Sequence, residues 1–190
     1  MKISKIGQFY TTAKKYCIDN GGAQEIEFVT NNVRKGFENQ TAEQFFKQYM
    51  YVVINSGMKN QIAEDIYKRA IINGLTAIGH PGKRKAIQDV NSRYRHLFEE
   101  LKTKETIAKK LEFLETLPWI GPITKYHLAR NIGIDVAKPD RHLVRIARCF
   151  GYDDVQKMCK DISEETGDRV GVVDVILWRY CNLNPNYMES

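Results

Sequence analysis

Residues 114–150 read LETLPWIGPITKYHLARNIGIDVAKPDRHLVRIARCF, and they predict a helix, a tight turn, a helix, a loop and a third helix. The segment 117–121, LPWIG, ends the first helix. Pro122 suits the first position of the next helix, because its missing N–H would have no helical partner there. Glycine at 121 has no Cβ to obstruct another backbone. The turn therefore exposes backbone N–H groups at the start of the second helix, namely those of Gly121, Ile123 and Thr124. These groups favour the binding of an anion such as a phosphate.

The third helix begins with a second signal, AKPDRH at residues 137–142. Pro139 keeps the residue before it extended. Asp140 then falls at the N-cap of a helix whose periodicity is clear over 143–147. Read locally, Asp140 accepts a backbone N–H and caps this helix.

The remaining chain is predicted to be almost entirely helical. Residues 40–56 place Phe45, Tyr49, Val52 and Val53 on one face, the spacing of an amphipathic helix. Thr41 and Gln44 give this helix a capping box. The short β-branched run at 26–30 fits better in a helix that reaches Phe37. Further helices are predicted over 59–73, 83–101 and 104–116, and His80-Pro81-Gly82 is read as a break.

Composition limits the class of protein. The 190 residues carry 29 Lys and Arg against 23 Asp and Glu, a net charge of +6 that suits a polyanionic partner. The mean hydropathy is −0.45, and no apolar run approaches the length of a membrane span. The charged N-terminus is unlike a signal peptide, so we expect a cytoplasmic protein, associated with the nucleoid if it is bacterial. The four cysteines form no C-x-x-C pair, which argues against zinc and iron–sulfur sites.

Together, the turn and Asp140 resemble the helix-hairpin-helix (HhH-GPD) DNA glycosylase superfamily, endonuclease III-like but without the iron–sulfur cluster. Leu117, Pro118, Ile120 and Gly121 match the family's hairpin, and Asp140 with His142 matches its D-x-H motif. The resemblance implies an all-α, two-lobed fold with a cleft between the lobes. It places a central lobe at about 41–135 and a second lobe at 1–40 plus 136–190.

The resemblance also implies base-excision repair of DNA, with Asp140 as the catalytic carboxylate. Trp119 replaces the first hairpin glycine of the family, a change that could alter how the turn meets the phosphates or could offer an aromatic surface. Ile123 stands where bifunctional members carry a catalytic lysine, and isoleucine cannot form a Schiff base. We therefore expect a monofunctional hydrolase in which Asp140 stabilises the developing positive charge on the sugar and activates water.

Two other interpretations keep the fold but change the function. In one, the protein is a bifunctional glycosylase and AP lyase that uses Lys125 or Lys138 as the nucleophile. In the other, it is a non-catalytic DNA-binding protein in which the hairpin contacts phosphates and Asp140 is only a cap.

The expected partner is double-stranded DNA containing a lesion or a mismatch, bound by a monomer that makes no membrane contact. Besides the hairpin amides, the residues expected to contact DNA are Trp119, Lys125, His142, Met58, Lys59, Asn60 and Gln61. By resemblance, Met58 could wedge into the base stack, and Asn60 or Gln61 could bind the base left unpaired. No cofactor is expected to be required. The resemblance also implies a potassium or sodium ion held by backbone carbonyls of Glu115, Leu117 and Ile120.

Overall fold

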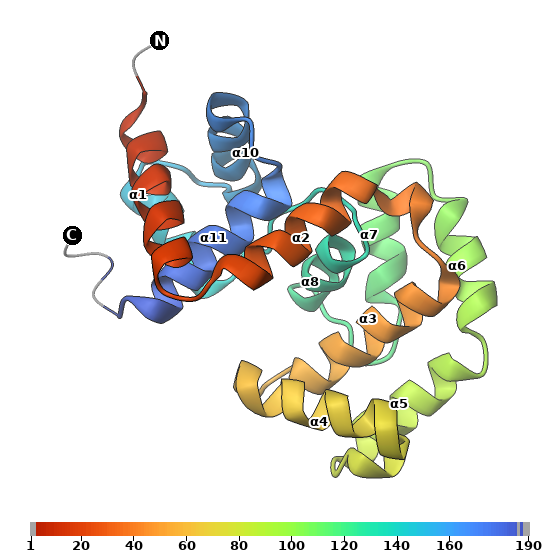
Figure 1. Cartoon of the computed structure of the whole chain (residues 1–190). Helices are drawn as coiled ribbons and strands as arrows, with labels where there is room; N and C mark the ends of the chain where they lie inside the picture. Colours follow the sequence, from red (N-terminus) through yellow and green to blue (C-terminus); the bar gives the residue numbers. More distant parts are fainter. Residues whose placement is uncertain (1–2, 186, 188–190) are drawn as a thin grey trace. The chain divides into compact units, whose positions relative to one another are not determined.

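The computed structural model describes residues 3–185 and 187 of the chain. In that part the chain forms eleven α-helices and two short 3-10 helices (Phe37–Asn39 and Leu75–Ala77), with no strand, which confirms the predicted all-α class (Figure 1). The helices are α1 (Lys5–Asp19), α2 (Ala23–Lys35), α3 (Ala42–Asn55), α4 (Asn60–Asn73), α5 (Pro81–Asn91), α6 (Tyr94–Lys102), α7 (Ile107–Glu115), α8 (Thr124–Asn131), α9 (Arg141–Cys149), α10 (Val155–Thr166) and α11 (Val170–Leu183). None of these helices combines the length and the apolarity that a membrane crossing requires.

The chain divides into two compact units. Unit 1 contains the residues up to Phe37 and those from Gly133 onward, and unit 2 is Glu38–Ile132. The sequence places these boundaries after residues 40 and 135, three residues further along the chain in each case. Residues 1–2, 186 and 188–190, which the sequence assigns to the second lobe, lie outside the described residues.

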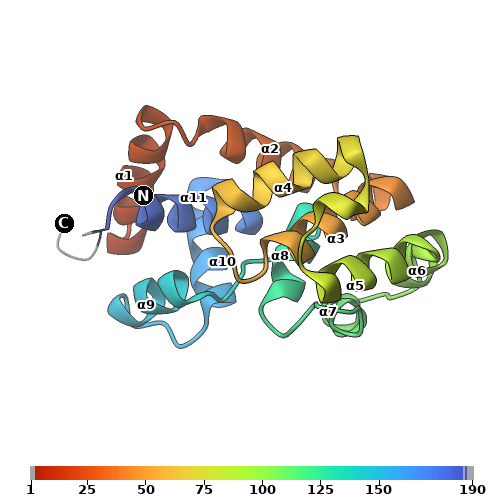
Figure 2. The same ribbon diagram turned by 90° about the horizontal axis from the view of Figure 1, so that it is seen from below.

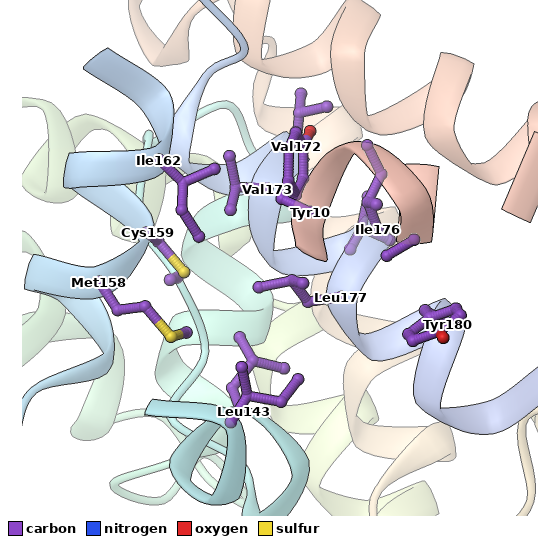
Figure 3. Close-up of a cluster of buried hydrophobic side chains, with 14 of the residues drawn as sticks. Tyr10, Leu143, Met158, Cys159, Ile162, Val172, Val173, Ile176, Leu177 and Tyr180 are labelled. Carbon is purple, nitrogen blue, oxygen red and sulfur yellow. The ribbon is translucent and has the colours of Figure 1, made fainter. Parts of the chain in front are cut away.

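Unit 1 is built around α11, which packs against α1, α2, α9 and α10. Figure 3 shows Leu143 of α9 and Met158 and Ile162 of α10 gathered with Leu177 of α11 in one apolar cluster. Each of these four side chains is fully buried. Because α11 meets neighbours on several sides, it is apolar almost all round instead of along one stripe.

Unit 2 is organised by α3, which contacts α4, α5, α6 and α8 (Figure 2). The predicted inward face of α3 is confirmed, since Phe45, Tyr49, Val52 and Val53 are completely buried. The predicted capping box is also present. The Thr41 hydroxyl accepts the Gln44 N–H at 3.2 Å, and the Gln44 side-chain oxygen accepts the Thr41 N–H at 2.9 Å.

The predicted single helix over 83–101 is wrong, because α5 ends at Asn91 and α6 begins at Tyr94. At the junction the Ser92 hydroxyl donates to the Asp89 carbonyl at 2.7 Å, a local bond that competes with the helical ladder. Arg93 then leaves the helical region at φ −139°.

The predicted break at residues 80–82 is instead the start of α5. The His80 ring accepts the Lys83 N–H at 3.4 Å, and Pro81 is the first helical residue. Proline is well tolerated at the first position of a helix, because the N–H that it lacks would have no helical partner there.

Candidate functional site

The hairpin between α7 and α8 belongs to unit 2. The regular part of α8 begins at Thr124, two residues later than the predicted start at Pro122. However, the Gly121 carbonyl already accepts the Lys125 N–H at 3.0 Å, which is the i to i+4 bond of an α-helix. The hairpin therefore leads directly into a helix N-terminus.

The amides of this N-terminus differ in their availability. The Gly121 N–H, expected to be exposed, donates to the Thr124 hydroxyl at 2.7 Å, and this corrects the prediction. Within residues 3–185 and 187, the N–H groups of Ile123 and Thr124 have no hydrogen-bond acceptor. Those two amides are therefore the ones that could receive an anion.

Trp119 occupies the tip of the hairpin in a left-handed conformation, with φ +65°. Its residue surface is 43% exposed. The sequence predicted an unusual hairpin at this position, but it gave no indication of the backbone conformation.

Lys125 forms an ion pair with Glu115 at the end of α7, with 2.5 Å between Nζ and Oε2. Its Nζ also lies 5.7 Å from the centre of the Tyr126 ring. The Lys125 side chain is mostly buried, whereas Ile123 at the family's lysine position is exposed. Of the two amines that the lyase interpretation offers, Lys125 and Lys138, the first is thus paired with a carboxylate.

The residues whose carbonyls are expected to bind a monovalent cation lie at the end of α7, in the case of Glu115, and within the turn itself, in the case of Leu117 and Ile120. The Leu117 carbonyl accepts the Ile120 N–H at 3.1 Å. A carbonyl oxygen has a second lone pair, so this bond leaves the Leu117 oxygen able to accept a further ligand. Across the described part of the chain, no group of three or more His, Cys, Asp or Glu residues could hold a metal ion.

The four residues predicted to approach the lesion lie in the turn after α3, where Met58 and Lys59 stand, and at the start of α4, which begins with Asn60 and Gln61. Asn60 is tied within the protein: its side-chain oxygen accepts from Tyr51 and from Asn55, each at 2.8 Å, and its NH₂ donates to Glu64 at 2.7 Å. Lys59 and Gln61 are exposed, and Met58 is half-buried. Of the two amides proposed to bind an unpaired base, Gln61 is therefore the more available.

Asp140 lies in unit 1 and caps α9, as the sequence predicts. Its Oδ1 atom accepts the His142 N–H at 2.9 Å and the Leu143 N–H at 3.1 Å. Its Oδ2 atom makes no hydrogen bond to the described residues, and the side chain is partly exposed. The carboxylate therefore has one oxygen committed to the fold and one available for chemistry.

Two side chains that the sequence reading missed anchor the segment before Asp140. Asp174 of α11 accepts the Lys138 N–H at 2.9 Å, and Gln156 of α10 bonds both the N–H and the carbonyl of Ala137. Asp174 is only 1% exposed. A carboxylate within the apolar run VGVVDVILW was a visible signal, because a buried acid needs donors from elsewhere in the fold.

His142 has a partner near the C-terminus. Its Nδ1 atom lies 3.3 Å from the Tyr187 hydroxyl, and the two rings meet edge to face. Burial lowers the pKa of His142; Asp140 opposes this effect, and Arg145 adds to it. Tyr187 had no signal in the sequence, because it lies 45 residues from His142.

No protein-family model matches the chain. Among solved structures, it is similar to the 8-oxoguanine glycosylase/lyase of Methanocaldococcus jannaschii in complex with 15mer DNA containing 8-oxoguanine. The identity is 19% and the TM-score 0.65, over 92% of this chain and 96% of that one. The 8-oxoguanine DNA glycosylase of Thermotoga maritima gives 17% identity and a TM-score of 0.67, over 91% and 95% of the two chains. A further structure of the M. jannaschii glycosylase gives 19% and 0.66, over 94% of each chain. Along more than nine tenths of its length, the chain therefore has the fold of these glycosylases.

Proposed function

We propose that the protein is a monofunctional DNA glycosylase that hydrolyses the N-glycosidic bond of a damaged or mispaired base. The observation that carries the proposal is the Asp140 carboxylate, which caps α9 through Oδ1 alone, in a chain with the fold of 8-oxoguanine glycosylases. A cap needs one oxygen, so Oδ2 is left to act on a ligand.

In this proposal the hairpin holds the DNA strand by its backbone. The N–H groups of Ile123 and Thr124 bind a phosphate at the helix N-terminus. Gly121 supports this role: a Cβ placed there would meet nothing closer than the Thr124 hydroxyl at 4.0 Å. Because neither packing nor a positive φ within the protein requires glycine at 121, the close approach of a DNA backbone accounts for it. A sodium or potassium ion on the Glu115, Leu117 and Ile120 carbonyls would add positive charge beside that phosphate.

The target nucleotide leaves the base stack before the reaction. As its glycosidic bond breaks, positive charge develops on the sugar, and Asp140 stabilises that charge and accepts a proton from the attacking water. Asp174 and Gln156 fix the backbone ahead of Asp140, so the carboxylate is positioned by the fold and not by the substrate. The departing base takes up a proton and leaves as the free base.

The absence of a hairpin lysine supports hydrolysis over lyase chemistry. Ile123 cannot form a Schiff base, and Lys125 is paired with Glu115. A non-catalytic DNA-binding role is the second candidate, since Asp140 is also a complete helix cap.

Release of free base from oligonucleotides, each with one defined lesion, tests the proposal. The panel begins with 8-oxoguanine, the base named for the structurally similar enzymes, and includes uracil, mismatched thymine and alkylated purines. We expect base release by the native protein and none by Asp140→Asn. Duplex binding without release from any member of the panel would favour the non-catalytic role.

A further inference from the structure

Trp119 adopts a backbone conformation that its side chain does not favour. In the part of the chain that the structure describes, it is the one residue other than glycine with a positive φ. A bulky L-residue is strained in this region, and such strain tends to accompany function. A glycine at 119 would make the same turn without strain, so the indole itself requires an explanation.

Core packing does not supply that explanation. Trp119 is 43% exposed and is among the few large apolar residues of the chain that lie at the surface. A residue retained for its contribution to the core would be buried. Trp119 instead keeps more than two fifths of its surface exposed.

The ring nevertheless rests on a defined seat, which we call the indole cradle: His80, Gly82 and Lys83 at the start of α5. The His80 ring meets the indole nearly perpendicularly, with 5.1 Å between the ring centres. The Lys83 Nζ atom lies 5.9 Å from the centre of the indole. A Cβ at Gly82 would lie 3.1 Å from the indole Cζ2 atom, so the seat depends on glycine there.

The cradle is itself held in place. Lys83 is 4% exposed, and its ammonium donates to the carbonyls of Ile54 at 2.8 Å and Ser56 at 2.6 Å. His80 caps α5 by accepting the Lys83 N–H. The exposed indole is therefore fixed before any ligand arrives, which reduces the entropy lost when it binds.

We propose that the exposed side of the Trp119 indole is a stacking surface for an unpaired DNA base. This inference rests on the proposed function for its ligand, DNA held at the adjacent hairpin. An aromatic ring stacks on the face of a base, and in intact duplex those faces are already covered by neighbouring bases. Trp119 thus favours DNA with a base out of the stack, the state in which a glycosylase handles its substrate.

The first test is the fluorescence of Trp119. The chain contains two tryptophans, so Trp178→Phe leaves Trp119 as the sole reporter. We expect a duplex with one unpaired base to quench this emission strongly and the fully paired duplex to quench it weakly. Equal quenching by both duplexes, or none, would overturn the inference.

The second test compares Trp119→Phe with Trp119→Leu. Both side chains keep a Cβ at the strained position, but only phenylalanine has a ring. Against the duplex with an unpaired base, we expect Leu to lower the affinity by roughly 5- to 150-fold, the value of one base–aromatic stack, and Phe to lower it less. Affinity for the paired duplex should change little at the same salt concentration. Equal affinity of the two variants would refute stacking.

Trp119→Gly separates a ligand role from a packing role. Glycine relieves the positive φ, so we expect the melting temperature to hold or rise while affinity for the unpaired base falls as with Leu. A lower melting temperature with unchanged affinity would show that the ring only packs on the cradle. In the cradle, Gly82→Ala should weaken binding and Gly79→Ala should not, since a Cβ at Gly79 meets nothing within 4 Å. Equal behaviour of these two variants would contradict the cradle's role.

The two proposals fail separately. If Trp119 emission is quenched but no lesion is released, the glycosylase proposal fails and the stacking surface stands. If damaged bases are released through Asp140 while Trp119→Leu and Trp119→Phe bind DNA alike, the stacking surface fails and the glycosylase proposal stands.

Discussion

The Oδ1 atom of Asp140 accepts the backbone N–H of Leu143 at 3.1 Å. This hydrogen bond stabilises the start of α9, whereas the chemistry proposed for Asp140 depends on the negative charge of its carboxylate. An asparagine side chain keeps a cap oxygen and loses the charge. The two roles can therefore be separated by one substitution.

We expect Asp140→Asn to fold with nearly native stability, because asparagine caps helices as well as aspartate does. Its rate of base release should fall by roughly 100-fold or more, the contribution of a general base. Asp140→Ala should lose the same activity and in addition about 1 kcal/mol of stability. Urea denaturation and single-turnover release measure the two effects.

Asp154 provides the matched control. It caps α10 through both carboxylate oxygens, with Oδ1 accepting the N–H of Gln156 at 3.0 Å and Oδ2 accepting that of Lys157 at 3.3 Å. Asp154→Asn should leave base release unchanged. If both asparagine variants lose activity equally, the loss reflects helix capping and not catalysis.

The Lys125–Glu115 ion pair leads to a prediction about lyase chemistry. A nucleophilic amine must be free to reach the sugar, whereas the Lys125 Nζ atom lies 2.5 Å from a Glu115 carboxylate oxygen and is engaged in that ion pair. We expect borohydride to trap no covalent complex between the native protein and lesion-containing DNA. Lys125→Met should retain base release.

A trapped complex would contradict monofunctional hydrolysis. Lys125→Met and Lys138→Met would then identify the nucleophile, because only one of them should abolish trapping. The stability cost of Lys125→Met should stay below about 1 kcal/mol, since its partner Glu115 remains partly solvated.

Lys83 is predicted to stabilise unit 2 through the carbonyls at the end of α3. Burial lowers the pKa of its ammonium, and the carbonyls of Ile54 and Ser56 replace the water that it loses. Lys83→Met leaves both carbonyls without this donor, so we expect a loss of about 3 kcal/mol in urea denaturation. Lys85→Met, two residues on and exposed, should stay within about 0.5 kcal/mol of the native protein. A similar small effect at Lys83 would show that water replaces the ammonium.

Local patterns accounted for most of what the sequence predicted correctly. The caps at Thr41 and Asp140 were predictable because each depends on residues two or three positions away. The break after Asn91 was missed because serine and arginine are common inside helices, and only the Ser92 hydroxyl bond to Asp89 distinguishes this pair.

The supporting residues of the site were missed for a different reason. Asp174 lies 36 residues from Lys138, and Lys83 lies 29 residues from Ile54, so neither contact has a local spacing. The hydrogen bond from the Gly121 N–H to the Thr124 hydroxyl was also missed, although its spacing is local. Thr124 lies three residues after Gly121, a spacing at which a side chain can bond to the backbone at the start of a helix, so this bond had a signal in the sequence.

The buried thiol of Cys17 predicts alkaline destabilisation of unit 1. Burial raises its pKa to about 11, with Arg179 opposing the shift and Glu25 adding to it. In the unfolded chain the thiol loses its proton near the ordinary value of 9.0. Its contribution to stability is therefore complete below pH 9 and is lost as the pH rises toward 11.

The measurement is the free energy of unfolding of native protein and Cys17→Ala from pH 7.5 to 10.5, under reducing conditions. By linkage, the native protein should lose about 2 kcal/mol more than Cys17→Ala over this range. Tyr10, whose pKa burial also raises, titrates in both proteins and cancels in the difference. Cys149→Ala is the control, because Cys149 is exposed and its variant should follow the native curve. If Cys17→Ala loses as much stability as the native protein, the thiol reaches water in the folded state and the core around α11 is open at that point.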